Sequence, residues 1–119
     1  MDQNTLMIAL VVVILAWFGF SRYQKSKNGA VIAAAIAEGA VVVDVRTAGE
    51  YGGHHYYGAI NIPVDTLAIK LSKVGAKDKP VVVYCASGGR SAAAAGILRR
   101  AGFSRVVNGG GLSNMPPRK

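Results

Sequence analysis

The sequence predicts an α/β domain with a mostly parallel central sheet flanked by helices, preceded by one N-terminal transmembrane helix. Three observations predict this fold class. An uncharged, strongly apolar block lies near the N-terminus, and short runs rich in valine and isoleucine recur along the rest of the chain. Such runs are typical of strands that are buried on both faces of a parallel sheet. Helical stretches lie between the runs, which favours parallel β/α packing.

The apolar block spans residues 6–20. It is short for a transmembrane helix, since about 20 apolar residues cross a bilayer comfortably. Ten of its residues are Leu, Ile, Val or Phe, which favour insertion by on the order of 3 to 6 kcal/mol in total. A cleaved secretory signal is disfavoured, because no Lys or Arg precedes the block and no small-residue cleavage site ends it. We therefore expect a membrane anchor, with the core helix of a soluble protein as the alternative.

Three cations, Arg22, Lys25 and Lys27, follow the block directly. By the positive-inside rule, the chain after the block stays in the cytoplasm. We expect residues 1–28 to form a transmembrane anchor and linker, and residues 29–119 to form the folded domain. The protein would then be membrane-anchored and single-pass, with its domain on the cytoplasmic side.

The elements of the domain are expected in the following order. Residues 21–29 are polar and predict a linker, and residues 30–38 predict a short helix that Gly39 ends. Strands are expected at four apolar runs, at residues 41–45, 60–64, 81–84 and 105–108. Helices are expected between them at residues 65–74 and 91–101.

Charge and cysteine content exclude some classes of function. The net charge is +8, but the basic residues are scattered and no stacking aromatics are interleaved with them, so no nucleic-acid partner is expected. Cys85 is the only cysteine, so the chain cannot form an internal disulfide, and a lone thiol suits a reducing compartment. No cofactor or metal is expected.

The segment that carries chemistry begins where the third apolar run ends, at Cys85. A tight loop containing Gly88 and Gly89 follows, and a helix begins at Ser91. Loop N–H groups, the helix N-terminus and the guanidinium of Arg90 can then converge on the sulfur and stabilise a thiolate. The alternative is a small buried core residue, which has no need of two glycines and an arginine beside it.

Several motifs resemble the rhodanese family, over about residues 30–112. The matching pieces are Val43–Arg46, Glu50–Tyr51, Gly58–Pro63, Tyr84–Ser91, Gly102–Phe103 and Val106–Gly110. The resemblance implies a single-domain, rhodanese-like sulfurtransferase. In that chemistry Cys85 takes sulfur from a small donor such as thiosulfate, holds it as a persulfide, and passes it to a thiol or cyanide acceptor.

The loop after the cysteine is the expected substrate-binding element. Its members are Ala86, Ser87, Gly88, Gly89, Arg90 and Ser91. Four residues separate Cys85 from Arg90, as in rhodaneses, whereas the similar dual-specificity phosphatases and arsenate reductases have five, so phosphatase chemistry is disfavoured. We expect Arg90 to orient the loop or the donor, and its removal to raise the pKa of Cys85.

Residues outside the loop are expected to support it. Asp44, Arg46 and Glu50 match the family's Asp-Val-Arg motif and its acidic position, and we expect them to pair and fix a loop. His55 matches the family's usual histidine, but His54 stands where a glycine is usual. Neither histidine is expected to be a catalytic base or metal ligand, because a thiolate ionised by its loop needs no base.

The end of the domain departs from the family pattern. Met115 stands where rhodaneses usually carry a tryptophan, and two prolines follow it. The pocket wall is therefore expected to be shorter or more open. A non-catalytic, membrane-tethered binding or regulatory module is the main alternative function, although the intact loop favours an enzyme. A redox sensor would need a resolving thiol, which the chain does not supply.

Overall fold

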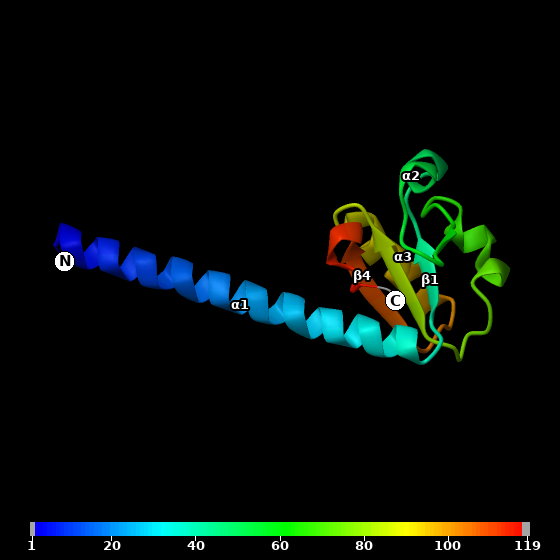
Figure 1. Ribbon diagram of the computed structural model, residues 1–119, viewed down its shortest axis with the longest axis horizontal. Helices are drawn as coiled ribbons and strands as arrows, with labels where there is room; N and C mark the ends of the chain where they lie inside the picture. Colours follow the sequence, from blue (N-terminus) through cyan, green and yellow to red (C-terminus); the bar gives the residue numbers. More distant parts are fainter. Residues whose placement is uncertain (1, 118–119) are drawn as a thin grey trace.

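The computed structural model describes residues 2–117, together with their side chains except those of residues 24–27. It consists of a long N-terminal helix, α1 (Gln3–Ala37), and an α/β domain at the C-terminal end of that helix (Figure 1). The predicted fold class is confirmed, with one apolar N-terminal helix preceding a parallel sheet.

Helix α1 is continuous, which corrects one sequence prediction. The linker expected over residues 21–29 and the separate helix expected from residue 30 are wrong, because residues 3–37 form one helix. The connecting segment contains no proline, and a single glycine such as Gly29 costs only about 1 kcal/mol relative to alanine in a helix. The expected terminator is correct, since Gly39 has φ +90° and its N–H donates to the carbonyl of Ile36.

The N-terminal part of α1 is long and apolar enough to cross a membrane. None of its most apolar 18-residue window is buried against the domain, which argues against the core helix of a soluble protein. Lys25 and Lys27, two of the three cations expected next to the membrane, have side chains outside the described residues.

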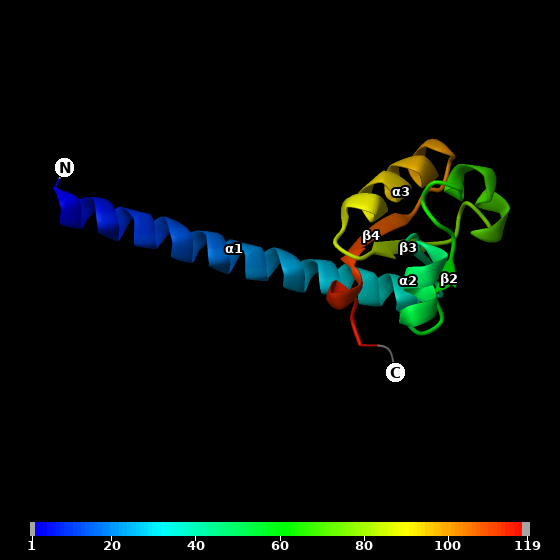
Figure 2. The same cartoon turned by 90° about the horizontal axis from the view of Figure 1, so that it is seen from above.

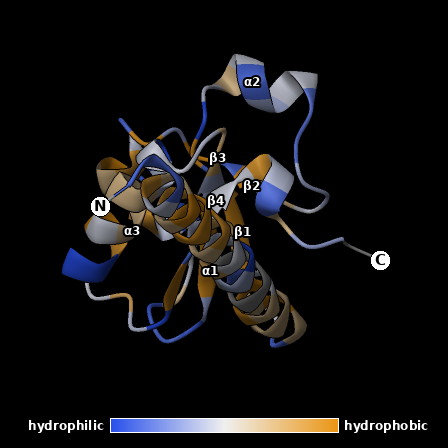
Figure 3. Cartoon of the chain, turned by 90° about the vertical axis from the view of Figure 1, so that its left-hand side faces the viewer, coloured by the Kyte–Doolittle hydropathy of each residue, from blue (hydrophilic) through white to orange (hydrophobic). Residues whose placement is uncertain are grey.

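The part of the chain that the structure describes contains a four-stranded, fully parallel sheet. Its strands are β1 (Val41–Asp44), β2 (Ile60–Asn61), β3 (Val81–Cys85) and β4 (Val106–Gly111), in the spatial order β2-β1-β3-β4. The central strand β3 is buried along its whole length, as its unbroken apolar run predicts. Figure 3 looks at the chain from the N-terminal side and shows the hydrophobic strands between the helices.

Helices cover both faces of the sheet. One face packs against α3 (Gly89–Arg100) and two 3-10 turns, η1 (Leu67–Ile69) and η2 (Leu71–Lys73). The other face packs against the last turns of α1, through Ile32 and Ala35. The longer helix expected at residues 65–74 is wrong, because Lys70 (φ −124°, ψ 28°) leaves the helical conformation and divides the segment into these two turns.

A short helix, α2 (Ala48–Gly53), was not predicted. Thr47 and Glu50 form a capping box at its N-terminus, in which each side chain bonds the other residue's backbone N–H. Three of its six residues are glycine, which is why helix propensity does not reveal it.

Helix α1 and the strands run in opposite directions. Asn28 and Ile32, in the C-terminal third of α1, line a pocket together with Gly109 and Gly110 near the carboxyl end of β4. The end of α1 leads through Gly39 to the first residue of β1. The carboxyl edge of the sheet therefore lies toward the N-terminal half of α1, as both views show (Figures 1 and 2).

Candidate active site

The cysteine lies at the carboxyl end of β3, where the chain turns into α3. Gly88 occupies the N-cap position with φ +108°, a left-handed conformation that side chains rarely adopt. Gly89 is the first residue of α3 and has no such constraint, so only the first of the two expected glycines requires its flexibility. The Cys85 side chain is fully buried beneath this loop.

The loop and the first turn of α3 supply hydrogen-bond partners to the sulfur. The N–H of Gly88 donates to Cys85 Sγ at 2.9 Å, and Ser91 Oγ lies 3.5 Å from the same atom. Ser91 Oγ also lies 2.9 Å from the carbonyl oxygen of Gly88. A thiol can therefore donate to Ser91 while the hydroxyl donates to Gly88, and a thiolate can accept the hydroxyl proton instead.

These contacts favour the thiolate. Burial raises the pKa of Cys85, but hydrogen bonds from the Ser91 hydroxyl and from the N–H groups of Ser91, Gly88 and Ser87 lower it by more. The net pKa lies below its ordinary value. The loop thus acts as an anion cradle, as the strand-loop-helix pattern predicts.

Arg90 pairs with a carboxylate of α2. Its Nη1 and Nη2 donate to Glu50 Oε1 and Oε2 at 2.7 and 3.0 Å, and no described hydrogen bond joins Arg90 to the sulfur. Hydrogen bonds from Arg90 and from the Thr47 backbone hold the pKa of Glu50 down at about 2. The pair therefore ties the first turn of α3 to α2, and Arg90 acts on Cys85 through its charge alone.

This geometry makes Ser91 a stronger determinant of sulfur ionisation than Arg90. We expect Ser91→Ala to raise the pKa of Cys85, because the variant loses the largest hydrogen bond that lowers it. The pH dependence of Cys85 alkylation by iodoacetamide, a neutral reagent, should therefore shift to higher pH. Arg90→Ala is the matched comparison and should shift the midpoint less. A midpoint in Ser91→Ala equal to that of the native protein contradicts this prediction.

The glycines at the end of β4 form the wall behind the loop, and they were not predicted to be part of the site. A Cβ at Gly111 would stand 2.6 Å from the carbonyl oxygen of Ala86. Gly110 has φ +74°, and its carbonyl oxygen lies 3.4 Å from Ser91 Oγ. The run of three glycines was the available signal, since close backbone approach is one reason for glycine in a strand.

A buried polar network supports the site from the side of β1. Asp44, which is fully buried, accepts hydrogen bonds from Arg46 Nε and Nη2 at 3.0 and 2.7 Å and from the Tyr84 hydroxyl at 2.8 Å. The same hydroxyl accepts from the N–H of Tyr56, and Arg46 donates to the carbonyl of His54. Burial is the main cause that raises the pKa of Tyr84 to about 12. Asp44 and Arg46 thus pair as expected and fix the chain after α2.

A groove of about 700 Å³ opens beside the loop. Its lining residues are Arg46, His54, His55, Tyr56, Tyr57, Ala86, Leu112, Ser113, Met115, Pro116 and Pro117. His55 stacks on Tyr51, with ring centroids 3.7 Å apart, and its Nδ1 lies 2.8 Å from the Tyr51 carbonyl oxygen. Met115 forms part of the groove wall and packs in the core beside Tyr84.

Comparisons with known proteins agree with this geometry. The family model described as a rhodanese-like domain matches residues 29–114. The chain is 37% identical over 71 residues to a sulfurtransferase of Allochromatium vinosum, covering 60% of this chain and 65% of that protein. It is 38% identical over 74 residues to thiosulfate sulfurtransferase PspE of Escherichia coli, covering 61% of this chain and 71% of that protein.

A solved structure shows the same relationship. The structure described as rhodanese with anions from E. coli superposes with a TM-score of 0.60 at 38% identity, covering 64% of this chain and 93% of that one. The matched portion in each comparison is shorter than the whole chain, as expected when α1 projects from the domain.

Proposed function

This chain belongs to the family of rhodanese-like domains, and on that premise we propose that it is a sulfurtransferase. It moves sulfane sulfur from a donor such as thiosulfate to a thiophilic acceptor through a persulfide on Cys85. The single observation that carries the proposal is the cradle of hydrogen bonds that lowers the pKa of Cys85. A buried core cysteine has no use for such a cradle.

The first half of the reaction loads the cysteine. The Cys85 thiolate attacks the outer sulfur of thiosulfate, a new bond forms between the two sulfurs, and sulfite leaves with the electron pair of the broken bond. The negatively charged outer sulfur of the persulfide then needs donors. The N–H groups of residues 86–91 and the N-terminus of α3 supply them, and Ser91 stabilises the inner sulfur.

The second half regenerates the thiolate. A thiol or cyanide acceptor attacks the outer sulfur, and the electron pair of the persulfide bond returns to Cys85 Sγ. The hydrogen bonds that favour the thiolate therefore also make Cys85 a good leaving group in this step. Arg90, tied to Glu50, holds the first turn of α3 in place during both steps.

Mass spectrometry of the intact protein tests this proposal. Incubation with thiosulfate should add the mass of one sulfur atom to Cys85, and cyanide or a reductant should remove it. A protein that takes up no sulfur from thiosulfate or another sulfane sulfur donor would instead support a non-catalytic, membrane-tethered module.

We further propose that α1 anchors the protein in a membrane with its domain in the cytoplasm. The helix is long and apolar enough to span a bilayer, and three cations follow its apolar part. Protease added outside intact cells or spheroplasts should leave residues 29–119 uncut, whereas lysis should expose them to digestion. Digestion of the domain before lysis contradicts this orientation.

A further inference from the structure

The direction of α1 relative to the sheet places the active site at one particular end of the domain. Asn28, in the C-terminal third of α1, lies beside Gly110, and Gly110 lies against the cysteine loop through Gly88 and Ser91. The opposite end of the sheet, where β1 and β3 begin, follows the last turn of α1. The Cys85 loop is therefore at the end of the domain that faces the apolar part of the chain.

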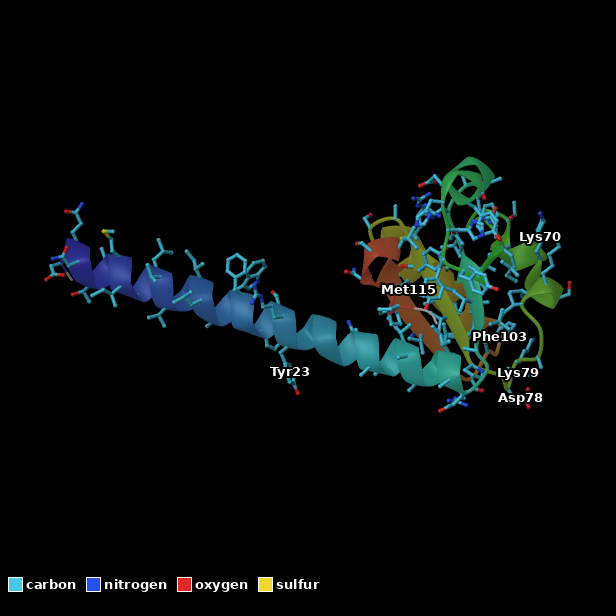
Figure 4. The ribbon with its side chains drawn as sticks, viewed as in Figure 1. Tyr23, Lys70, Asp78, Lys79, Phe103 and Met115 are labelled. Carbon is cyan, nitrogen blue, oxygen red and sulfur yellow. The ribbon has the colours of Figure 1, made fainter. Side chains whose placement is uncertain are left out.

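The labelled side chains show which end of the domain faces the N-terminal part of α1. In Figure 4, Met115 of the groove wall lies on the side of the domain toward Tyr23. Phe103, Asp78 and Lys79 lie at the opposite end. The groove thus shares the end of the domain that carries the cysteine loop.

The distance between this end and a bilayer is short. From Phe20, which ends the apolar block, to Asn28 the helix advances eight residues, which is about 12 Å at ~1.5 Å per residue. The headgroup layer beyond the hydrocarbon takes up about 5 to 7 Å of that length. About 5 to 7 Å then separates the headgroups from the level of Asn28 and Gly110, against which the cysteine loop packs, when α1 stands upright in the bilayer.

This gap limits what can reach the sulfur. Thiosulfate and other small ions can enter it. A folded domain of about 100 residues has a radius of gyration of about 13 Å and cannot enter. A macromolecular acceptor must therefore already lie at the membrane surface.

We propose that the sulfur acceptor is a cysteine thiol in the juxtamembrane segment of an integral membrane protein. This inference rests on the proposed sulfur transfer and on the proposed anchor. An extended segment leaving the bilayer fits the groove beside Ala86, which is open and lined by aromatic and proline side chains. The acceptor thiolate attacks the outer persulfide sulfur, a disulfide-type bond forms to it, and the bond to Cys85 Sγ breaks. The Cys85 thiolate leaves with the electron pair, and the acceptor becomes a persulfide.

The test measures how the rate of sulfur transfer depends on the height of the acceptor cysteine above the membrane. The full-length protein is reconstituted in phosphatidylcholine vesicles with synthetic transmembrane helices that carry a single cysteine. One peptide places the cysteine two residues beyond its apolar span, and the other places it on a helical extension about 18 residues further, which is about 27 Å higher. After loading with thiosulfate, transfer should be about tenfold faster to the near cysteine, because its effective concentration at Cys85 is higher.

A lengthened protein provides the matched control. Inserting about 18 helix-forming residues after Tyr23 adds about five turns, which raises the domain by about 27 Å without rotating it. This variant should reverse the preference and favour the far cysteine, while its rate with thiosulfate and cyanide stays unchanged. Equal transfer to both peptides by the native protein, or an unchanged preference in the lengthened variant, overturns the inference. Loss of the thiosulfate and cyanide reaction in the native protein instead refutes the proposed function itself.

Discussion

Replacing Cys85 with serine is expected to abolish sulfur transfer from thiosulfate to cyanide. The site around residue 85 stabilises an anion, through the N–H of Gly88 and the hydroxyl and N–H of Ser91. A serine hydroxyl stays protonated at neutral pH, so the same donors have no anion to stabilise and no nucleophile forms. We expect the rate to fall by on the order of 10³-fold or more, as is usual when a nucleophile is removed.

The fold of this variant should be preserved. Serine is slightly smaller than cysteine, and its oxygen can accept the hydrogen bond from Gly88 and bond to Ser91 in place of the sulfur. Circular dichroism and the thermal unfolding midpoint check this directly. Sulfur transfer near the native rate in a folded Cys85→Ser protein means that the reaction does not pass through a persulfide on this residue.

Replacing Gly111 with alanine is expected to have the second largest effect. The added Cβ would stand 2.6 Å from the Ala86 carbonyl oxygen and 3.3 Å from its carbonyl carbon. Both are backbone atoms, so they cannot rotate away, and the loop that begins at Cys85 must shift. Overpacking of this kind costs about 1 to 3 kcal/mol of stability. We expect activity to fall by about 10²-fold, the cost that a displacement of about 1 Å can have in a preorganised site.

Gly52→Ala is the matched control for this prediction. Gly52 is exposed in α2, and a Cβ there would meet no atom within 4 Å. The control should keep native activity and stability. Steady-state rates are compared at a temperature where both variants are folded by circular dichroism. Native kcat/KM in Gly111→Ala shows that the loop tolerates displacement, which contradicts the role assigned to the glycine wall.

The sequence predicts the sheet well and its connections less well. Residues 41–43 and 81–85 are continuous apolar runs, and such runs can be recognised because a parallel strand is buried on both faces. Strand β2 covers only Ile60–Asn61, although the apolar run extends to residue 64. Residues 65–74 also lose their predicted helix. These differences depend on tertiary packing beside the strands, which a local pattern does not contain.

In the candidate site too, local features could be predicted from the sequence, whereas contacts between distant segments could not. The local features could be predicted from the sequence: the position of Cys85 at a strand end, the turn at Gly88 and the N-terminus of the following helix. The partner of Arg90 could not, because Glu50 lies 40 positions away in the sequence and reaches it only once α2 has formed. The contact between Gly111 and Ala86 likewise depends on the neighbouring positions of β3 and β4.

The unbroken α1 also connects the domain rigidly to the apolar N-terminal part of the chain. Transmembrane helices are tilted from the bilayer normal by about 20° on average. Because residues 3–37 form one helix whose last turns are packed on the sheet, any tilt in the bilayer passes undiminished to the domain. In the proposed membrane-anchored protein, the angle at which the cysteine loop meets the membrane surface is therefore set by the tilt of α1, and a break in α1 would remove that dependence.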